Sequence, residues 1–425
     1  MFRYSSAQYP LSPEEFRRAL SIGLGRALLH SKQCGLTKNA EDVFQAAVDC
    51  TVYDPQSEGY PAPWIADLCV AAGVAEKVIE APLPLCSDSR NLQLRCALMK
   101  QFAERGSSHA RSVLYSACIR DEATADVYAC EEIVELDGRE GLLFVAQRLG
   151  QFLAEDADFW VDSDLLEVFD STAGVGSGRA LLDRAASSDA DVRRYLEALS
   201  LSADPERPPS AREGSFEDTF ALIVESQRNL FWLSSWSRKL GPLAPRQLTR
   251  LVQLALGAAT PIVKRNALRG IAGSPQLPVL PELIPLLRYD DEFVRFFAAK
   301  ALGQCRSPSV RQAGLELLSQ HFGTALETLR SSALPEDAAR IHQALIDQAL
   351  PEDLHEVVYP IVKLLSSNRT LDPSLLSLFV YFESPCSRCR ADAVAALVHG
   401  KCAPQWLLQE ALHDAFPAVR DACVA

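Results

Sequence analysis

The residues best suited to binding a metal ion are Cys386 and Cys389, which form a Cys-x-x-Cys pair and are followed by His399 and Cys402. Thiolate and imidazole are the ligands that zinc prefers, and a structural site needs four of them around one tetrahedral ion. Cys389 and His399 are expected on the same helix, where ten residues of helical rise separate them by about 15 Å. They cannot share one ion. The sequence therefore favours buried thiols at these positions and predicts no metal and no cofactor.

A glycine-rich stretch, Gly174 to Arg179, precedes an expected helix and could cradle a phosphate with its backbone amides. It lacks the Lys-Ser/Thr ending of a Walker loop and the strand and glycine spacing of a dinucleotide-binding loop. A flexible turn is the favoured interpretation. The sequence also contains no recognisable combination of nucleophile, base and orienting group, so we expect a protein that is not an enzyme.

The stretch from Tyr53 to Trp64 interrupts the helical pattern with aromatic, acidic and amide side chains in a turn-rich context. Loops on rigid scaffolds are common positions for binding groups. The candidate binding residues here are Tyr53, Asp54, Gln56, Glu58 and Trp64. In the alternative interpretation the aromatic side chains pack over one end of the fold and Asp54 caps a turn. Such turn chemistry is common and favours this alternative.

Acidic side chains are concentrated between residues 121 and 170, where fifteen Asp and Glu face only two Arg. The local net charge of -13 equals the formal charge of the whole chain. A phosphate backbone would be repelled, so nucleic acid is not expected to bind this segment. Two interpretations stay open: a solvated acidic face, which is the usual role of a charge run, or a docking surface for a basic protein. The docking candidates are Glu155, Asp156, Asp158, Asp162 and Asp164.

A recurring pattern, Val-Arg-x-x-Ala-x-x-x-Leu, indicates the scaffold that must position these residues. Variants of it begin at Val263 and Val294, 31 residues apart, which is room for two short helices and two turns. The Val, Ala and Leu positions lie on one face of a helix. One helix pair cannot bury that face alone, so neighbouring pairs must stack. The sequence predicts an all-α protein built from stacked helix pairs.

The run Asp290 to Arg295, followed by Ala298 and Leu302, resembles the HEAT-repeat family, and Asp189 to Arg193 is the next best copy. The resemblance covers residues 261–320 and 386–425 and extends more weakly over 90–200. It implies a right-handed α-solenoid that binds partners through a concave surface of second helices. The arginines able to form a basic ladder on that surface are Arg265, Arg269, Arg295, Arg311 and Arg390.

The expected organisation has four parts. Residues 1–90 form an N-terminal helical region, and 91–201 form helical repeats that include the acidic segment. Residues 202–215 contain three prolines and no aliphatic side chain larger than Ala, which predicts a linker or mobile loop. Residues 216–425 form C-terminal HEAT-like repeats. Because the chain stops inside an expected repeat at Ala425, either a longer protein or a covering partner is expected there.

We expect a cytoplasmic protein that has no membrane span, because the chain has no long apolar run or secretory signal and its twelve cysteines form no disulfide framework. The favoured function is a scaffold or regulatory module that binds a partner protein, which the acidic segment suggests is basic. Two alternatives stay open. One is a HEAT-like nucleic-acid-binding protein or DNA-repair-type enzyme. The other is an acidic inhibitor or immunity protein against a basic toxin.

Overall fold

A computed structural model describes residues 4–54, 56, 60–83, 89–120, 127–156, 159–202 and 215–424. Glu58, Asp158 and most of the predicted linker lie outside these described residues. Throughout the described ranges the regular structure is helical, without a strand, and an isolated bridge joins Arg120 to Val127. The predicted all-α fold is confirmed. None of the described helices combines the length and apolar character needed to cross a membrane.

The chain divides into two compact units. The N-terminal unit comprises Ala7–Pro208 and His413–Phe416, and the C-terminal unit comprises Met1–Ser6, Pro209–Leu412 and Pro417–Ala425. The helices of the N-terminal unit are α1 (Pro13–Ile22), α2 (Gly25–Cys34), α3 (Ala40–Val48), α4 (Ala62–Ala72), α5 (Ala75–Glu80), α6 (Ser89–Glu104), α7 (Ser108–Ser116), α8 (Cys130–Glu155), α9 (Asp164–Ala173), α10 (Ser177–Ala185) and α11 (Ala190–Ser202).

The helices of the C-terminal unit are α12 (Phe216–Glu225), α13 (Leu233–Leu240), α14 (Pro245–Gly257), α15 (Pro261–Gly273), the 3-10 helix η1 (Pro281–Arg288), α16 (Glu292–Leu302), α17 (Pro308–Leu317), α18 (Phe322–Leu329), α19 (Asp337–Asp347), α20 (His355–Ser367), α21 (Ser374–Glu383), α22 (Ser387–His399), α23 (Gln405–Ala411) and α24 (Pro417–Asp421).

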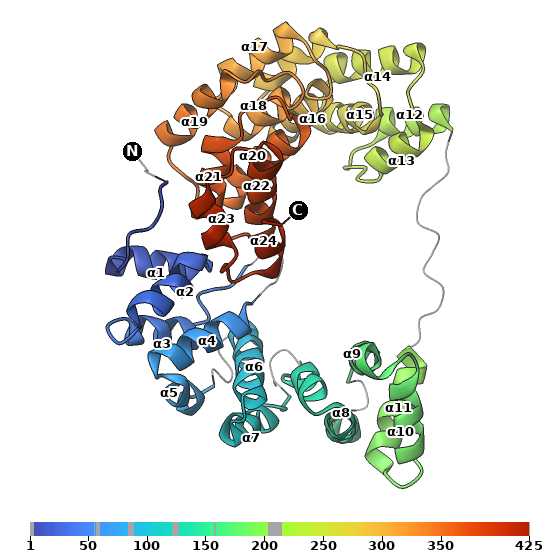
Figure 1. The fold of residues 1–425 in the computed structure, drawn as a ribbon. Coiled ribbons are helices and arrows are strands. Elements are labelled where there is room, and N and C mark those ends of the chain that lie inside the picture. Colours follow the sequence, from blue (N-terminus) through green and yellow to red (C-terminus); the bar gives the residue numbers. More distant parts are fainter. Residues whose placement is uncertain are drawn as a thin grey trace. The chain divides into compact units, whose positions relative to one another are not determined.

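Stacking of helix pairs is clearest in the C-terminal unit. Helices α14 and α15, η1 and α16, α17 and α18, and α21 and α22 pack as pairs (Figure 1). Their second helices form a continuous row, in which α15 contacts α16, α16 contacts α18, α18 contacts α20, α20 contacts α22, and α22 contacts α24. Each helix therefore buries its apolar face against its own partner and against the next pair, which is the packing of an α-solenoid.

The repeat pattern buries the residues that it was expected to bury. In α16, the side chains of Val294, Ala298 and Leu302 are fully buried. In α15, Ala267 and Ile271 are fully buried at the corresponding positions, and Val263 is half-buried. These positions recur about once per helical turn, so they form one apolar stripe that faces the neighbouring helices.

Helix α8 of the N-terminal unit is broken at Gly138. This residue adopts φ 53° and ψ −116°, which no helix contains and which glycine adopts most readily. The turn is tight, because a Cβ atom at Gly141 would lie 2.3 Å from the carbonyl oxygen of Ile133. The break divides the 26-residue helix into two arms and gives its acidic first arm a direction of its own.

Candidate protein-interaction surfaces

Arg265 forms an ion pair that joins two successive repeats. It lies on α15, and its Nε donates a hydrogen bond of 2.8 Å to Oδ1 of Asp291, while its Nη2 donates to Oδ2. Asp291 is the N-cap of α16 and also accepts the backbone N–H of Val294 at 3.0 Å. The hydrogen bonds from Arg265 lower the pKa of the Asp291 carboxyl. The charge of Arg265 is therefore engaged in positioning the start of the next second helix.

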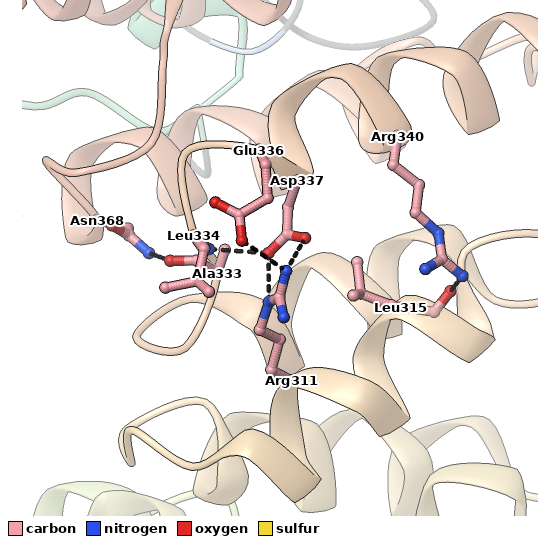
Figure 2. A network of polar contacts seen from close by, with 8 residues as sticks. All are labelled: Arg311, Leu315, Ala333, Leu334, Glu336, Asp337, Arg340 and Asn368. Atoms are coloured by element: carbon pink, nitrogen blue, oxygen red, sulfur yellow. Dashed lines mark hydrogen bonds and ion pairs between the residues drawn. The ribbon is translucent and has the colours of Figure 1, made fainter.

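Arg311 makes the same kind of contact two repeats later, again across 26 residues (Figure 2). Its Nε and Nη2 donate to the two carboxylate oxygens of Asp337 at 2.7 and 2.6 Å, and Glu336 lies beside the pair. Asp337 is buried and also accepts the backbone N–H of Leu334 at 2.8 Å. A bidentate pair with a buried carboxylate fixes the loop before α19 and leaves little of the Arg311 charge for a partner.

The other arginines of the expected ladder are also engaged within the fold. Arg295 donates to the backbone oxygens of Tyr289 and Asp290 at 2.7 and 2.9 Å. The guanidinium of Arg269 lies between the rings of Phe231 and Phe297, 4.8 and 4.6 Å from their centroids.

The expected basic ladder stays a prediction, and the structure places two of its five arginines differently from the other three. The side chain of Arg390 is fully buried, where it bonds backbone oxygens of the loop before α22. Arg311 lies on α17, which is a first helix and not a second one. The physical reason is that an arginine next to a repeat's apolar stripe finds backbone and carboxylate acceptors inside the stack.

The Tyr53 to Trp64 segment shows contacts that belong to a structural turn. Asp54 is fully buried and accepts the backbone N–H of Gln56 at 2.9 Å. The indole of Trp64 is 5% exposed and donates to the backbone oxygen of His413 at 3.1 Å. Tyr53 is half-buried and Gln56 is exposed. These contacts favour the interpretation in which Asp54 caps a turn and Trp64 packs in the core.

Backbone amides of the glycine-rich stretch before α10 donate hydrogen bonds to the side-chain carboxylate of Asp170. Asp170 accepts the backbone N–H of Gly176 at 2.6 Å and that of Gly178 at 2.7 Å. These are amides of the kind that a phosphate would need. In the described structure the Asp170 carboxylate therefore occupies the place that a bound phosphate would take. This favours the interpretation of the stretch as a turn.

Acidic residues from two helices meet at one surface of the N-terminal unit. Glu131 begins α8, Asp164 begins α9, and Asp162 lies just before α9. Burial raises the pKa of Glu131, and Glu135, Asp164 and Asp162 raise it further by charge repulsion. We call Glu131, Asp162 and Asp164 the acidic surface. In the described part of the chain none of these three forms an ion pair, whereas Glu135 pairs with Lys100.

An exposed aromatic side chain lies next to the acidic surface in the sequence. Trp160 is 71% exposed and is separated from Asp162 by one residue. Among the other candidates of this segment, Glu155 is exposed and Asp156 pairs with Arg120 at 2.6 Å. Trp160 is not a candidate by sequence alone, because a single Trp in a charged segment carries no periodic signal.

A buried carboxyl lies beside the acidic surface. Glu132 follows Glu131 in α8 but points inward, and only 7% of it is exposed. Its Oε1 accepts a hydrogen bond of 2.8 Å from Nε2 of Gln93. Burial is the largest cause of its shift and raises the pKa of Glu132 to about 7. This residue could not be distinguished from its acidic neighbours by sequence alone.

Comparison with known proteins identifies the repeats. The model of the HEAT repeats family matches residues 248–334, from α14 to just beyond α18. Residues 248–334 are therefore similar to HEAT repeats, and they include the ion pair between Arg265 and Asp291. No curated protein shows significant sequence similarity to the chain. The matched family and the stacked pairs define a helical repeat scaffold.

Proposed function

We propose that this scaffold binds a basic partner protein on the acidic surface of the N-terminal unit. The observation that supports the proposal is the meeting of Glu131, Asp162 and Asp164, which come from two helices and form no ion pair within the described structure. Burial is the largest cause of the raised pKa of Glu131, and charge repulsion from Glu135, Asp164 and Asp162 raises it further. A cationic partner would relieve that repulsion.

Trp160 supplies the apolar contact that such a surface needs. Charge complementarity mainly accelerates association, whereas buried aromatic anchors provide much of the binding energy. A large ring that is 71% exposed beside carboxylates has this combination of properties. A basic protein with a pocket for an aromatic side chain is therefore the partner that fits.

The arginines are the weaker docking candidates. Arg265 and Arg311 are bonded to carboxylates of neighbouring repeats, so a partner would have to compete with those pairs. Within the described residues, the three carboxylates of the acidic surface form no ion pair with which a partner would have to compete. The C-terminal unit then serves mainly as the rigid part of the scaffold.

Affinity capture with matched variants tests the proposal. The test variant carries Glu131→Gln, Asp162→Asn and Asp164→Asn. The control carries Glu225→Gln, Glu282→Gln and Glu352→Gln, three exposed residues of the C-terminal unit, so that both variants change net charge equally. We expect wild type and control to capture the same basic protein from the source cells, and the test variant to lose it.

A second variant, Trp160→Ala, should weaken capture by about tenfold or more while the charge is unchanged. Equal capture by all variants would contradict the proposal. Recovery of nucleic acid in place of a protein would favour the alternative in which the scaffold reads nucleic acid.

A further inference from the structure

Three side chains with metal-binding chemistry converge in the C-terminal unit. His355 is the first residue of α20, Cys386 is the N-cap of α22, and Cys389 lies in the first turn of α22. Their ligand atoms all lie within 4.8 Å of one another. Helices α20 and α22 are neighbours in the row of second helices, so the stack itself brings the imidazole to the two thiols.

The spacing matches the first coordination shell of zinc. Sγ of Cys389 lies 3.7 Å from Nδ1 of His355. Zn–S and Zn–N bonds of about 2.3 and 2.0 Å at the tetrahedral angle place a sulfur and a nitrogen about 3.5 Å apart. A zinc ion would therefore fit between these two atoms with little movement of the backbone.

Both sulfur atoms lie at the start of one helix. The N–H of Cys389 donates to Sγ of Cys386 at 3.5 Å, and both thiols lie at the N-terminal end of α22. The first turn of α22 therefore holds the two sulfur ligands close together. Both cysteines are buried and His355 is half-buried, which leaves one side for entry of the ion.

Neighbouring residues fix the orientation of the three ligands. The buried guanidinium of Arg390 donates to the backbone oxygens of Ser384 and Pro385, at 3.0 and 3.1 Å, and so holds the loop that leads into Cys386. Asp353 accepts the backbone N–H of His355 at 2.9 Å at the start of α20. The ring of Tyr359 lies 5.3 Å from the imidazole ring. These contacts hold the backbone segments that carry the three ligands.

We propose that His355, Cys386 and Cys389 form a binding site for one Zn²⁺ ion. Two thiolates and a neutral imidazole balance the charge of the ion, and binding releases two protons from the thiols. Among the described residues no further His, Cys, Asp or Glu joins this group, so water fills the fourth tetrahedral position. The site links two successive repeats of the C-terminal unit.

The site differs from the one considered from sequence. His399 is the last residue of α22 and Cys402 follows it, whereas Cys386 and Cys389 lie at the opposite end of the helix. The helix therefore keeps Cys389 and His399 from sharing an ion. The third ligand, His355, comes from the preceding second helix, and its position depends on stacking that the local motif does not encode.

Metal analysis of the full chain tests this proposal. We expect protein purified without chelator, in reducing buffer, to retain about one zinc per chain after desalting. Cobalt added to the metal-free protein should give the charge-transfer and visible d–d absorption of a tetrahedral thiolate site. Cys386→Ser is the sharpest variant, because Ser is itself a favoured N-cap and should preserve α22 while removing one thiolate.

Cys386→Ser and His355→Gln should each weaken zinc binding, measured by competition with a chromophoric chelator, by more than about tenfold. The control variant His399→Gln with Cys402→Ser should bind zinc as wild type does. Circular dichroism establishes that each variant is folded. Absence of stoichiometric zinc from wild type, a Cys386–Cys389 disulfide in its place, or unchanged affinity in folded Cys386→Ser would overturn the proposal.

Discussion

Charged residues of this chain have two different roles at the scale of single side chains. Arg265 binds the N-cap carboxylate of α16 and Arg311 binds the carboxylate of the first residue of α19, so their charges stabilise the stack. Glu131, Asp162 and Asp164 lie together without an ion pair in the described structure. The first arrangement uses its charges within the stack, whereas the second presents three carboxylates without an ion pair among the described residues, which makes the second the better indication of a binding surface.

The pair between Arg311 and Asp337 should contribute measurably to stability. Arg311→Ala leaves the buried Asp337 carboxylate without its charge partner, and Asp337→Ala removes both this pair and the acceptor of the Leu334 N–H, so we expect each to cost about 2 kcal/mol of unfolding free energy. The double variant should cost clearly less than the sum, because both changes remove the same bonds. Urea denaturation of the four proteins measures this coupling. Strict additivity would show that the pair does not act as a unit.

Glu132 predicts a specific pH dependence. Its pKa is raised to about 7 in the folded chain, from 4.5 in a solvated setting. The folded state therefore holds this proton more tightly, and stability is lost as the pH rises from about 4.5 through about 7. Glu132→Gln should be more stable than wild type by about 2 kcal/mol at about pH 8, with the difference vanishing near about pH 4.

Melting temperatures of wild type and Glu132→Gln, measured from about pH 4 to about pH 8, test this prediction. Glu140→Gln is the matched control, because Glu140 is an exposed residue of the same helix. We expect this control to follow wild type. A difference between Glu132→Gln and wild type that is the same at every pH would show that Glu132 does not titrate over this window.

At the scale of helices, the sequence predicts which side chains a helix buries, because that follows from the local spacing of apolar residues. The apolar stripe of α16, Val294, Ala298 and Leu302, is predictable because its period matches a helix and its residues have no polar atoms to satisfy. The burial of Arg390 is not, because an arginine beside the stripe looks the same whether it faces water or backbone oxygens. The approach of His355 to Cys386 is also not predictable, because it is a contact between repeats.

The break in α8 gives a test of backbone conformation at the same scale. Gly138 has a positive φ, and a Cβ atom added there would meet no other group within 4 Å, so Gly138→Ala should act through backbone strain alone. We expect it to cost about 1–2 kcal/mol of unfolding free energy. Gly257 of α14 also has open space around it but no positive φ, so Gly257→Ala should be neutral or slightly stabilising. Equal effects would contradict the assigned break.

At the scale of the whole molecule, the two units contribute different properties. The C-terminal unit contains residues 248–334, which match the HEAT repeats family, and a row of second helices that continues to α24. The N-terminal unit contains the acidic surface. The handedness of the solenoid and the linker at 202–215 stay predictions, because the handedness depends on geometry between successive repeats and most of the linker lies outside the described residues.

The central claim is that the acidic surface steers a basic partner. The most direct measurement is the association rate of the captured partner as a function of salt concentration. It compares wild type with two variants. The acidic-surface variant carries Glu131→Gln, Asp162→Asn and Asp164→Asn, and the arginine variant carries Arg295→Ala and Arg311→Ala. We expect fast, strongly salt-dependent association for wild type and the arginine variant, and slow association with a flat salt dependence for the acidic-surface variant. Loss of binding in the folded arginine variant, with the acidic-surface variant unchanged, would contradict the account.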